Sequence, residues 1–391
     1  MNAPVSSISP DLSIVIPCLN EEDTLGICLS KIQDIADQEK FTIEVIVADN
    51  GSLDKSIEIA SEFNARVVHV SNKGYGAALM GGIAQAKSSF ILMADADDSY
   101  DFMEVPKFFN ELNKGFDLVQ GCRLPRGGGV IKKGAMPWSH RHIGNPLFTL
   151  LVRSWFSSPI NDVYCGMRAF KKTFYESLKM KCNGMEFATE MIIKSANIKA
   201  NTAEVPITLH KDGRIQHPPH LRTIRDGWRT LQFFLLCAPS KLFLLPGITM
   251  CITGFIGCLL GYWGSSLGSV NLGAHTMLGS ALLIVSGYQA ILMHSLSLNL
   301  SERLGILTNR RNQYFKDFII SRGTIFSLTL LISGVSLWAK VFLSWYSSDF
   351  GTLDYATTMK VVIPGATLIS LSLETLIFSL FRSWLQVETS K

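Results

Sequence analysis

The sequence predicts an α/β domain with a mostly parallel sheet, followed by an all-α membrane domain of about four helices. Two observations predict this division. In residues 12–218, short apolar runs alternate with helix-like segments, which is the pattern of parallel strands joined by crossover helices. From Leu242 to Leu300 the chain carries no Asp, Glu, Lys or Arg, and two further long apolar stretches follow. About 20 apolar residues are enough to cross a bilayer as a helix.

Length and composition agree with two domains and exclude several classes of protein. The chain has 391 residues, with 36 Lys and Arg against 32 Asp and Glu, so its net charge is +4. This small excess, without a long basic run, argues against a nucleic-acid-binding protein. A hydrophobic fraction of 47% and a charged fraction of 17% argue against a wholly soluble or a disordered chain. Eight scattered cysteines without a Cys-x-x-Cys pair suit a reducing compartment.

The expected elements of the α/β domain follow one another in a regular order. Apolar runs that end in turn residues predict strands at 13–19, 43–49, 66–70, 90–94 and 118–121. Helical periodicity predicts helices between them, at 21–36, 54–63, 76–87 and 105–113. In such sheets, ligands bind beyond the carboxyl ends of the strands. The residues that follow each strand are therefore the candidates for a site.

The predicted membrane domain covers residues 241–391. Its spans are expected at about 242–264, 273–299, 324–346 and 361–385. Residues 1–11 are expected to form a flexible tail, since they lack the layout of a signal peptide. Residues 219–240 are expected to form an amphipathic helix in the membrane interface.

The loops between the spans predict the orientation in the membrane. Asp349 and Asp354 lie in the loop between the third and fourth spans, beside a single Lys360. The loop between the second and third spans carries Arg303, Arg310, Arg311, Lys316 and Arg322. Because basic loops stay in the cytoplasm, the α/β domain and the C-terminus are expected on the cytoplasmic side of an inner or plasma membrane.

The fourth predicted strand ends in a cluster of carboxylates. Asp95, Asp97 and Asp98 fall within four positions and repel one another unless a cation joins them. Such oxygen ligands suit Mg²⁺ or Mn²⁺, which often share a site with substrate phosphates. A solvated acidic turn is the alternative. The position after a buried strand favours metal binding by Asp95 and Asp97.

Polar residues also follow the first three strands. The first ends in Pro17, with Asn20 and Glu21 beyond it, and the second ends in Asp49. An Asp at this place can accept hydrogen bonds from a ribose or a base. No Gly-x-Gly-x-x-Gly follows the first strand, which disfavours a dinucleotide cofactor. Gly74, after the third strand, either brings backbone amides to a ligand or forms a plain turn.

Taken in order, these motifs resemble those of the family-2 inverting glycosyltransferases, which have a GT-A fold. The resemblance rests on Pro17 to Glu22, Asp49-Asn50-Gly51-Ser52, Gly74-x-Gly76, Asp95-Ala96-Asp97 and Gly121-Cys122-Arg123. Further motifs resemble the branch that transfers sugars to dolichyl or polyprenyl phosphate. They are Asp162, Cys165-Gly166-Met167-Arg168, Glu186 to Glu190 and Val205-Pro206-Ile207. The match covers about residues 13–215.

The resemblance implies roles for these residues. Asp97 and Asp162 would be the catalytic residues. Asp97, with Asp95, would hold the metal on the donor diphosphate. Asp162 would orient the acceptor or act as a base. Arg123 would face a phosphate. The nucleotide-sugar pocket would be lined by Pro17, Asn20, Glu21, Asp49, Gly74 and Asp95. Ser99 stands where many members carry a metal-binding Gln, so Ser99 or water would replace that ligand.

Basic residues are the candidates for the acceptor phosphate. Arg168 and Arg214 are expected there, although either Arg123 or Arg168 is alternatively an ordinary salt-bridge residue. Arg222 and Arg225 share one face of the predicted interface helix with Arg229. Another face carries Leu221, Ile224, Trp228 and Leu231. That pattern is typical of a helix at a bilayer surface, and the alternative is a helix packed on the soluble domain.

The function expected from the resemblance is transfer of a hexose from a UDP- or GDP-sugar to polyprenyl phosphate on the cytoplasmic leaflet. Transfer to another lipid, diacylglycerol or ceramide, is an alternative. A membrane binding or translocating protein with a degenerate transferase domain is another. The chain lacks the Gln-x-x-Arg-Trp of processive synthases. Glu374, the acid in the last span, marks either an oligomer contact or a pair with Lys340 or Arg382.

Overall fold

The computed structural model describes residues 9–215, 223–303, 305 and 313–387. The chain divides into two compact units, Met1–Phe234 and Leu235–Lys391. Arg222, Leu221, Arg310 and Arg311, which the sequence singles out, lie outside the described residues.

The first unit is built on a seven-stranded sheet with the order β3-β2-β1-β4-β7-β5-β8. All neighbouring pairs are parallel except those made by β7, so the prediction of a mostly parallel sheet is confirmed. The strands are β1 (Leu12–Cys18), β2 (Ile43–Asp49), β3 (Arg66–His69), β4 (Phe90–Met93), β5 (Leu118–Cys122), β7 (Arg168–Lys171) and β8 (Thr202–Pro206). A small second sheet pairs β6 (Val130–Ile131) with β9 (Thr208–Leu209).

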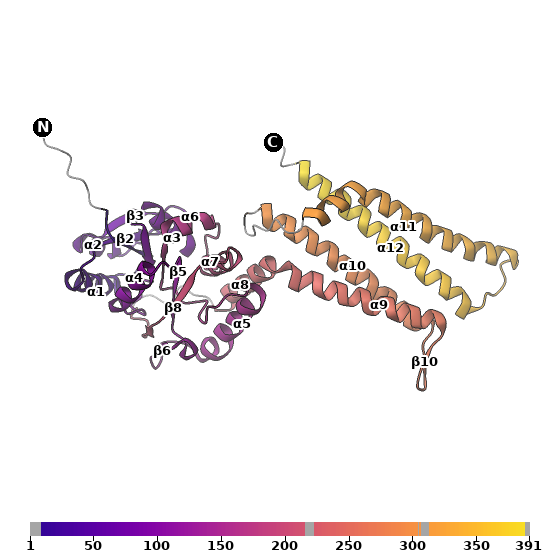
Figure 1. Cartoon of the computed structure of the whole chain (residues 1–391), viewed down its shortest axis with the longest axis horizontal. Coiled ribbons are helices and arrows are strands. Elements are labelled where there is room, and N and C mark those ends of the chain that lie inside the picture. The colour runs from indigo at the N-terminus through magenta and orange to yellow at the C-terminus, as the bar shows by residue number, and fades with distance from the viewer. Residues whose placement is uncertain (1–8, 216–222, 304, 306–312, 388–391) are drawn as a thin grey trace. The chain divides into compact units, whose positions relative to one another are not determined.

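Helices cover both faces of the sheet (Figure 1). Ile14 and Ile16 of β1 belong to one buried cluster with residues of α1 (Leu25–Gln38) and α4 (Val105–Asn113). Val15 of β1 points the other way, where α3 (Tyr75–Gln85) packs closely through Gly82. Successive residues of a strand point to opposite faces, so a strand covered on both sides is apolar throughout. The remaining helices of this sheet are α2 (Ser56–Glu62), α6 (Lys172–Leu178) and α7 (Glu186–Asn197).

Strand β7 is an element that the sequence analysis missed. It lies antiparallel between β4 and β5, with Ala169 opposite Leu92 on one side and Val119 on the other. Its four residues begin with Arg168 and end with Lys171, so they lack the long apolar run that marked the other strands. The consequence is that β4 and β5 are not neighbours, and the loops before β7 reach the edge where β4 ends.

Two long helices complete the first unit. Helix α5 (Asn145–Phe156), preceded by a π-helical turn at His140–Gly144, was not predicted. Helix α8 (Thr223–Cys237) falls within the predicted interface segment. Thr230 and Phe234 of α8 are buried, and the ring of Phe234 stacks on Phe148 of α5. Helix α8 thus packs on the domain through one face, while Trp228 and Arg225 on other faces remain exposed.

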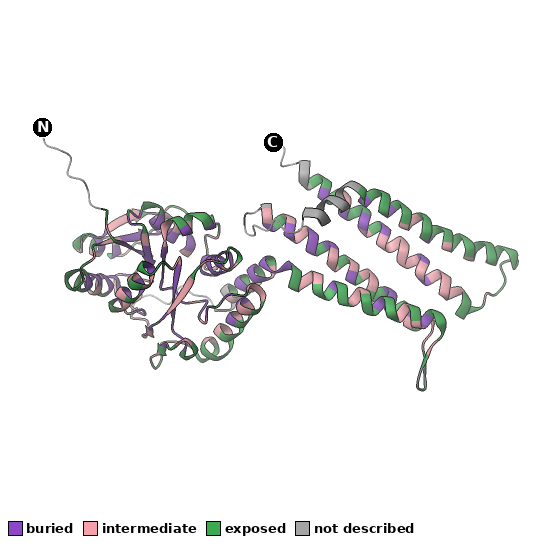
Figure 2. Ribbon diagram, viewed as in Figure 1, coloured by how far each residue is buried: buried purple, intermediate pink, exposed green. Residues whose placement is uncertain are grey.

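The second unit is a bundle of four helices, each long and apolar enough to cross a membrane. They are α9 (Leu245–Trp263), α10 (Ala274–Arg303), α11 (Gln313–Ser347) and α12 (Tyr355–Val387). A short hairpin of β10 (Ser266–Leu267) and β11 (Val270–Asn271) joins the first two. Figure 2 shows long exposed surfaces on α9 and α11, and their exposed residues are largely apolar. This distribution suits a hydrocarbon surrounding and confirms the predicted helical membrane domain.

Small residues let the membrane helices approach closely. Gly254 of α9 lies against the backbone of α10 at Ser280, and Gly334 of α11 lies against Gly365 of α12. Ser327 and Ser372 exchange hydrogen bonds across the second pair. Such contacts drive helix association where the hydrophobic effect cannot. Glu374 lies on α12 with its Oε2 buried and without a hydrogen-bond partner in the described part of the chain, and its pairing stays a prediction.

Candidate active site at the carboxyl edge of the sheet

Asp95 and Asp97 lie directly beyond β4, in a turn where Asp98 adopts a left-handed conformation with φ of 57°. The Tyr75 hydroxyl donates to Asp95 Oδ1 at 2.8 Å, and Gly166 lies against Asp95 Oδ2. The backbone N–H and the hydroxyl of Ser99 both donate to Asp97 Oδ1, at 3.1 and 2.6 Å. Each carboxylate therefore has one oxygen held by the protein, as expected of a site that must present the other.

The two carboxylates raise one another's cost of ionisation. Burial and the neighbouring Asp97 raise the pKa of the Asp95 carboxyl to about 6, and burial also raises the pKa of Asp97. A divalent cation between them would offset this repulsion, so the pair fits such an ion. In the described residues no group of three His, Cys, Asp or Glu side chains is placed to hold a metal. The remaining ligands would be water and substrate oxygens, the usual arrangement for Mg²⁺.

Ser99, which was expected to replace the missing ligand unless water does, is tied to Asp97 in the structure, and its role as a metal ligand stays a prediction. Its hydroxyl donates to Asp97 Oδ1, and the side chain is nearly buried. The hydroxyl thus orients Asp97 and favours its ionised form, because a donated hydrogen bond stabilises a carboxylate.

The ends of β1 and β2 are tied together by polar side chains. Asn20, with φ of 57°, accepts from Leu53 N through Oδ1 and donates its own N–H to Ser52 Oγ. Asp49 accepts from Gly51 N, Ser52 N and His69 Nδ1. Burial alone would raise the pKa of Asp49, but these hydrogen bonds together lower it. Asn20 and Asp49 are thus joined through Ser52 at the predicted nucleoside position, and Pro17 lies beside Ala48 in the same pair of strands.

Gly74 has a structural reason to be glycine. A Cβ at this position would lie 2.2 Å from Asn183 O, and its φ of +128° is unfavourable for other residues. Its N–H donates to Asn50 Oδ1 at 2.8 Å. The amide is therefore used within the protein, and of the two expected roles the structure supports the turn.

Arg214 lies among acidic side chains at this edge, and its expected contact with an acceptor phosphate stays a prediction. Its Nε and Nη2 bind the two oxygens of Glu21, at 2.7 and 2.5 Å. Its Nη1 lies 2.8 Å from Asp212 Oδ2 and 3.6 Å from Asp97 Oδ2. Arg214 therefore belongs to the edge formed by β1 and β4, where it brings together Glu21 and Asp97, residues far apart in the sequence.

Arg123 and Asp162 form a closed pair. Asp162 Oδ2 accepts from Arg123 N and Nε, and Asp162 Oδ1 accepts from Arg123 Nη2, all within 2.9 Å. Asp162 is fully buried and Arg123 is 8% exposed. The expectation that Arg123 faces a phosphate, and that Asp162 serves as a base, is not supported, because each group already satisfies the other. The pair joins the end of β5 to the loop before β7.

Arg168, also expected at the acceptor, is fully buried. Its guanidinium donates to the carbonyl oxygens of Ala188, Cys165 and Val163. Burial lowers the pKa of this group. A phosphate cannot reach it without unfolding these contacts, so we assign Arg168 to the architecture of the edge and not to the acceptor site.

Sequence analysis missed an exposed apolar surface on α5 and the turn before it. Trp138, Ile143, Leu147 and Leu150 are 69%, 55%, 49% and 60% exposed, and the last three share one helical face. Exposed basic side chains accompany them at Arg126, Lys132, Lys133 and Arg141. The signal in the sequence is that no Asp or Glu occurs between Asp117 and Asp162. A surface that is both apolar and basic suits contact with anionic lipid.

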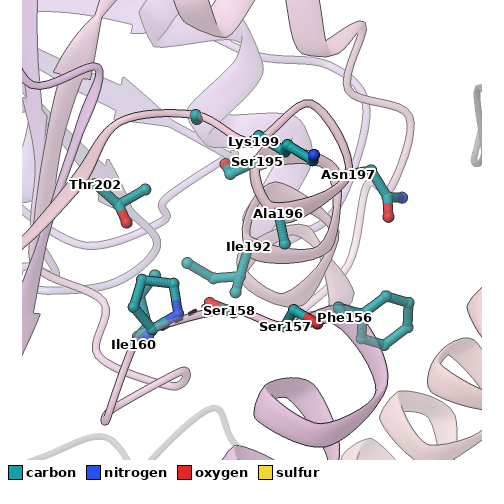
Figure 3. Close-up of a pocket in the computed structure, with 12 residues that line it drawn as sticks. Phe156, Ser157, Ser158, Ile160, Ile192, Ser195, Ala196, Asn197, Lys199 and Thr202 are labelled. Atoms are coloured by element: carbon teal, nitrogen blue, oxygen red, sulfur yellow. Dashed lines mark hydrogen bonds between the residues drawn. The ribbon is translucent and has the colours of Figure 1, made fainter.

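A pocket lies away from these residues. It has a volume of about 480 Å³ and is lined by the end of α7, by Thr202 at the start of β8 and by the segment from Phe156 to Ile160. Figure 3 shows Ser195, Asn197 and Lys199 on one side and Ser157 to Ile160 on the other. Because Thr202 begins a strand parallel to the others, this pocket lies at the opposite edge of the sheet, and none of the predicted site residues lines it.

Comparison with known proteins assigns the chain to a family. Residues 13–179 match glycosyl transferase family 2, and residues 297–386 match the family 2 C-terminal transmembrane region. The low-salt glycan biosynthesis hexosyltransferase of Haloferax volcanii is 33% identical, over 92% of this chain and 87% of that protein. The dolichyl-phosphate hexose transferase of the same organism is 32% identical, over 50% of this chain and 82% of that protein.

Further matches are more distant. An undecaprenyl-phosphate 4-deoxy-4-formamido-L-arabinose transferase of Pseudomonas fluorescens is 28% identical, over 50% of this chain and 56% of that protein. Among solved structures, a glucosyl-3-phosphoglycerate synthase of Mycobacterium tuberculosis matches with 19% identity and a TM-score of 0.45, over 60% of this chain and 80% of that one.

The sheet, the site and the apolar bundle, taken with these matches, define a membrane glycosyltransferase with a GT-A domain. The chain belongs to glycosyltransferase family 2. Its relatives include transferases named for dolichyl phosphate and undecaprenyl phosphate. The resemblance drawn from the motifs is thereby confirmed at the level of the family.

Proposed function

We propose that this chain transfers a hexose from a UDP- or GDP-linked sugar to polyprenyl phosphate, with Mg²⁺ or Mn²⁺ held by Asp95 and Asp97. The observation that carries the proposal is the carboxylate pair beyond β4, in which each residue has one oxygen fixed by Tyr75 or Ser99. Asn20, Glu21 and Asp49 lie at the adjoining strand ends. A donor with a nucleoside at β1 and β2 would carry its diphosphate toward β4.

The bound metal would act as a Lewis acid on the departing diphosphate, where negative charge grows during transfer. The chain's own residues set the conditions for that chemistry. Tyr75 and Ser99 fix the orientation of the two carboxylates, and Gly166 leaves room for Asp95 Oδ2 because no side chain fills that space. Preorganised groups of this kind cost little reorganisation during the reaction.

A lipid phosphate suits the acceptor side for two reasons. A phosphate monoester has a second pKa of about 6, so at neutral pH it is largely ionised and needs little help from a base. Asp162, the residue expected to act as base, is closed off by Arg123, which fits an acceptor of this kind. Exposed apolar and basic side chains on α5 and α8, including Leu147, Leu150 and Arg225, support a lipid partner.

The names of the relatives point in the same direction. They act on dolichyl phosphate and undecaprenyl phosphate, and we carry that acceptor class to this chain. Basic loop residues support a cytoplasmic position for the transferase domain. Diacylglycerol and ceramide acceptors have no observation of this kind in their favour.

The decisive variant is Asp97→Asn. We expect it to lower hexose transfer by about 100-fold or more, because the carboxylate would be lost from the metal site while its shape is kept. The measurement uses membranes that contain the full chain, a panel of radiolabelled nucleotide-sugars, and Mg²⁺ or Mn²⁺. Mild acid treatment of the lipid product then tests the acceptor, since a sugar phosphodiester is acid-labile and a glycoside of an alcohol survives.

Asp98→Asn is the matched control. Asp98 lies next to Asp97 but binds Lys31 at 2.7 Å, so its loss should leave transfer within about threefold of the parent. Asn also tolerates the left-handed conformation of this position. Equal activity in the parent and Asp97→Asn would refute the metal role, and an acid-stable product would refute the phosphate acceptor.

A further inference from the structure

The segment after β9 passes beside the end of β4 and forms hydrogen bonds to it. His210 N donates to Ser99 O at 2.8 Å, and Gly213 N donates to Asp97 O at 3.0 Å. Ile215 N donates to Asp23 Oδ2 at 3.0 Å. We call residues 210–215 the crossing loop. Its backbone is thus bound to the same turn that carries the proposed metal ligands, and its side chains are brought to that turn.

Arg214 of the crossing loop places a positive charge among the acids of the site. The guanidinium is only 10% exposed and meets the carboxylates of Glu21, Asp212 and Asp97. Both oxygens of Glu21 are engaged by it in a two-pronged pair. A bidentate pair between Arg and a carboxylate is among the stronger polar contacts in proteins, and stronger still when it is shielded from water.

This placement sets Arg214 against a divalent cation. An ion on Asp95 and Asp97 would lie close to the guanidinium, since Arg214 Nη1 is 3.6 Å from Asp97 Oδ2. Like charges at such distances in a site with little water repel strongly. The guanidinium and the metal ion would also bind the same carboxylate oxygen, Asp97 Oδ2, because Asp97 Oδ1 accepts hydrogen bonds from Ser99.

We propose that Arg214 is an internal counter-ion that competes with the divalent cation for Asp97, and that metal binding releases the Arg214 side chain from the site. This inference rests on the proposed function and deepens it. Arg214 would act as a positioning residue. Without a metal, its positive charge offsets the negative charges of Glu21 and Asp97 and holds these side chains close together. When the metal displaces Arg214, the carboxylate of Glu21 becomes available to the sugar donor.

The test is direct binding of Mn²⁺ to the full chain in detergent without any nucleotide, measured from the electron paramagnetic resonance signal of free Mn²⁺. Arg214→Gln should bind Mn²⁺ about tenfold more tightly than the parent, because the competing charge is gone. Arg214→Lys, which keeps the charge but not the two-pronged pair, should lie between them. A thermal unfolding curve for each variant shows that it is folded.

Lys31→Gln is the matched control, since it also removes one positive charge near the site. Lys31 binds Asp98 at 2.7 Å, whereas Glu21 and Asp97 face Arg214. Its Mn²⁺ affinity should stay within about twofold of the parent. An equal gain in Lys31→Gln and Arg214→Gln would reduce the effect to general charge and overturn the proposal, as would unchanged or weaker binding in Arg214→Gln.

A second measurement uses the parent chain alone. Trypsin cuts after Arg, and the bond after Arg214 should be cut several-fold faster when Mn²⁺ is present, because the side chain is released. Cutting after Arg126, which is exposed, serves as the reference and should not change. No acceleration at Arg214 contradicts the release. If Mn²⁺ binding is saturable but equal in the parent and Arg214→Gln, the competition is refuted and the proposed metal site stands. If neither protein shows saturable binding, the metal role in the proposed function is refuted as well.

Discussion

At the scale of single residues, the site depends on how two like charges are tolerated beside each other. Asp95 is half-buried beside Asp97, and the pKa of its carboxyl rises to about 6. The hydroxyl of Tyr75 acts in the other direction, since its hydrogen bond to Asp95 Oδ1 lowers that pKa. Tyr75 thereby helps to keep Asp95 ionised near neutral pH, where a cation would need it.

The raised pKa of Asp95 has a defined consequence for pH dependence. The carboxyl is easier to protonate in the folded chain than at its ordinary pKa of 3.8, so its contribution to stability is present below about pH 4 and lost as the pH rises through about 6. Cation affinity changes in the opposite sense, because the metal needs the ionised form. We expect the Mn²⁺ affinity of the parent to fall as the pH drops through about 6, and transfer activity to decline on the acid side with it.

Tyr75→Phe tests this account. Removal of the hydroxyl should raise the pKa of Asp95 further, so that the acid limb of the activity profile moves to higher pH. The measurement is kcat/KM at intervals between about pH 5 and about pH 8, with Mn²⁺ affinity at each point. Tyr175→Phe is the control, since the Tyr175 ring stacks on Phe170 outside the site. Coincident acid limbs in parent and Tyr75→Phe would contradict the role of the hydroxyl.

At the scale of elements, helix α5 turns a buried face toward the domain and an apolar face outward. Thr149 and Val152 are buried, whereas Leu147 and Leu150 are exposed. Exposed apolar side chains on one helical face, with basic side chains nearby and no acid, favour contact with lipid. Such a helix would give the domain a surface that contacts the chain and the phosphate of the proposed polyprenyl acceptor.

Replacement of Leu147 and Leu150 by Glu tests the role of that face. Transfer to a long polyprenyl phosphate in vesicles should fall by about tenfold or more, because burial of two leucines in lipid would be lost. Transfer to a short, water-soluble prenyl phosphate should change little. Ile198→Glu, at another exposed apolar position of the domain, is the control and should leave both rates unchanged. An equal loss with both acceptors would instead indicate damage to the domain.

At the scale of the whole molecule, the described residues contain four candidate spans, an even number, which suits a transferase domain and a C-terminus on one side of the membrane. The described spans are Ser240–Trp263, Ala274–Glu302, Arg322–Ser347 and Tyr355–Trp384. The basic residues between the second and third spans favour the cytoplasm for that side.

Reporter fusions measure this orientation. A green fluorescent protein fused after Lys391 should be fluorescent, because it folds in the cytoplasm. Alkaline phosphatase inserted after Gly268, in the hairpin of β10 and β11, should be active, because it folds only outside. The exchanged pair, phosphatase at Lys391 and fluorescent protein at Gly268, should give neither signal. A reversed pattern would place the domain outside and contradict the proposed leaflet.

Much of the fold was predictable because its signals are local. Apolar runs bounded by turn residues marked β1 to β5, and the absence of charge marked the membrane helices. The convergence of Asp49 and Asp95 on one edge followed from parallel strands alone, since their carboxyl ends meet there. Strands β7 and β8 and helices α5 to α7 were missed. In β7 only Ala169 and Phe170 are apolar, between Arg168 and Lys171, and α5 carries apolar residues on both faces.

The partners of the charged residues could not be predicted in the same way. Arg214 binds Glu21 across 193 positions, and Arg123 binds Asp162 across 39. Periodicity and turn chemistry act within about a dozen residues, whereas an ion pair depends on the path of the whole chain. Local pattern therefore places the carboxylates of the site at a strand end, but only the folded chain closes Asp162 with Arg123, buries Arg168 and sets Arg214 among the acids.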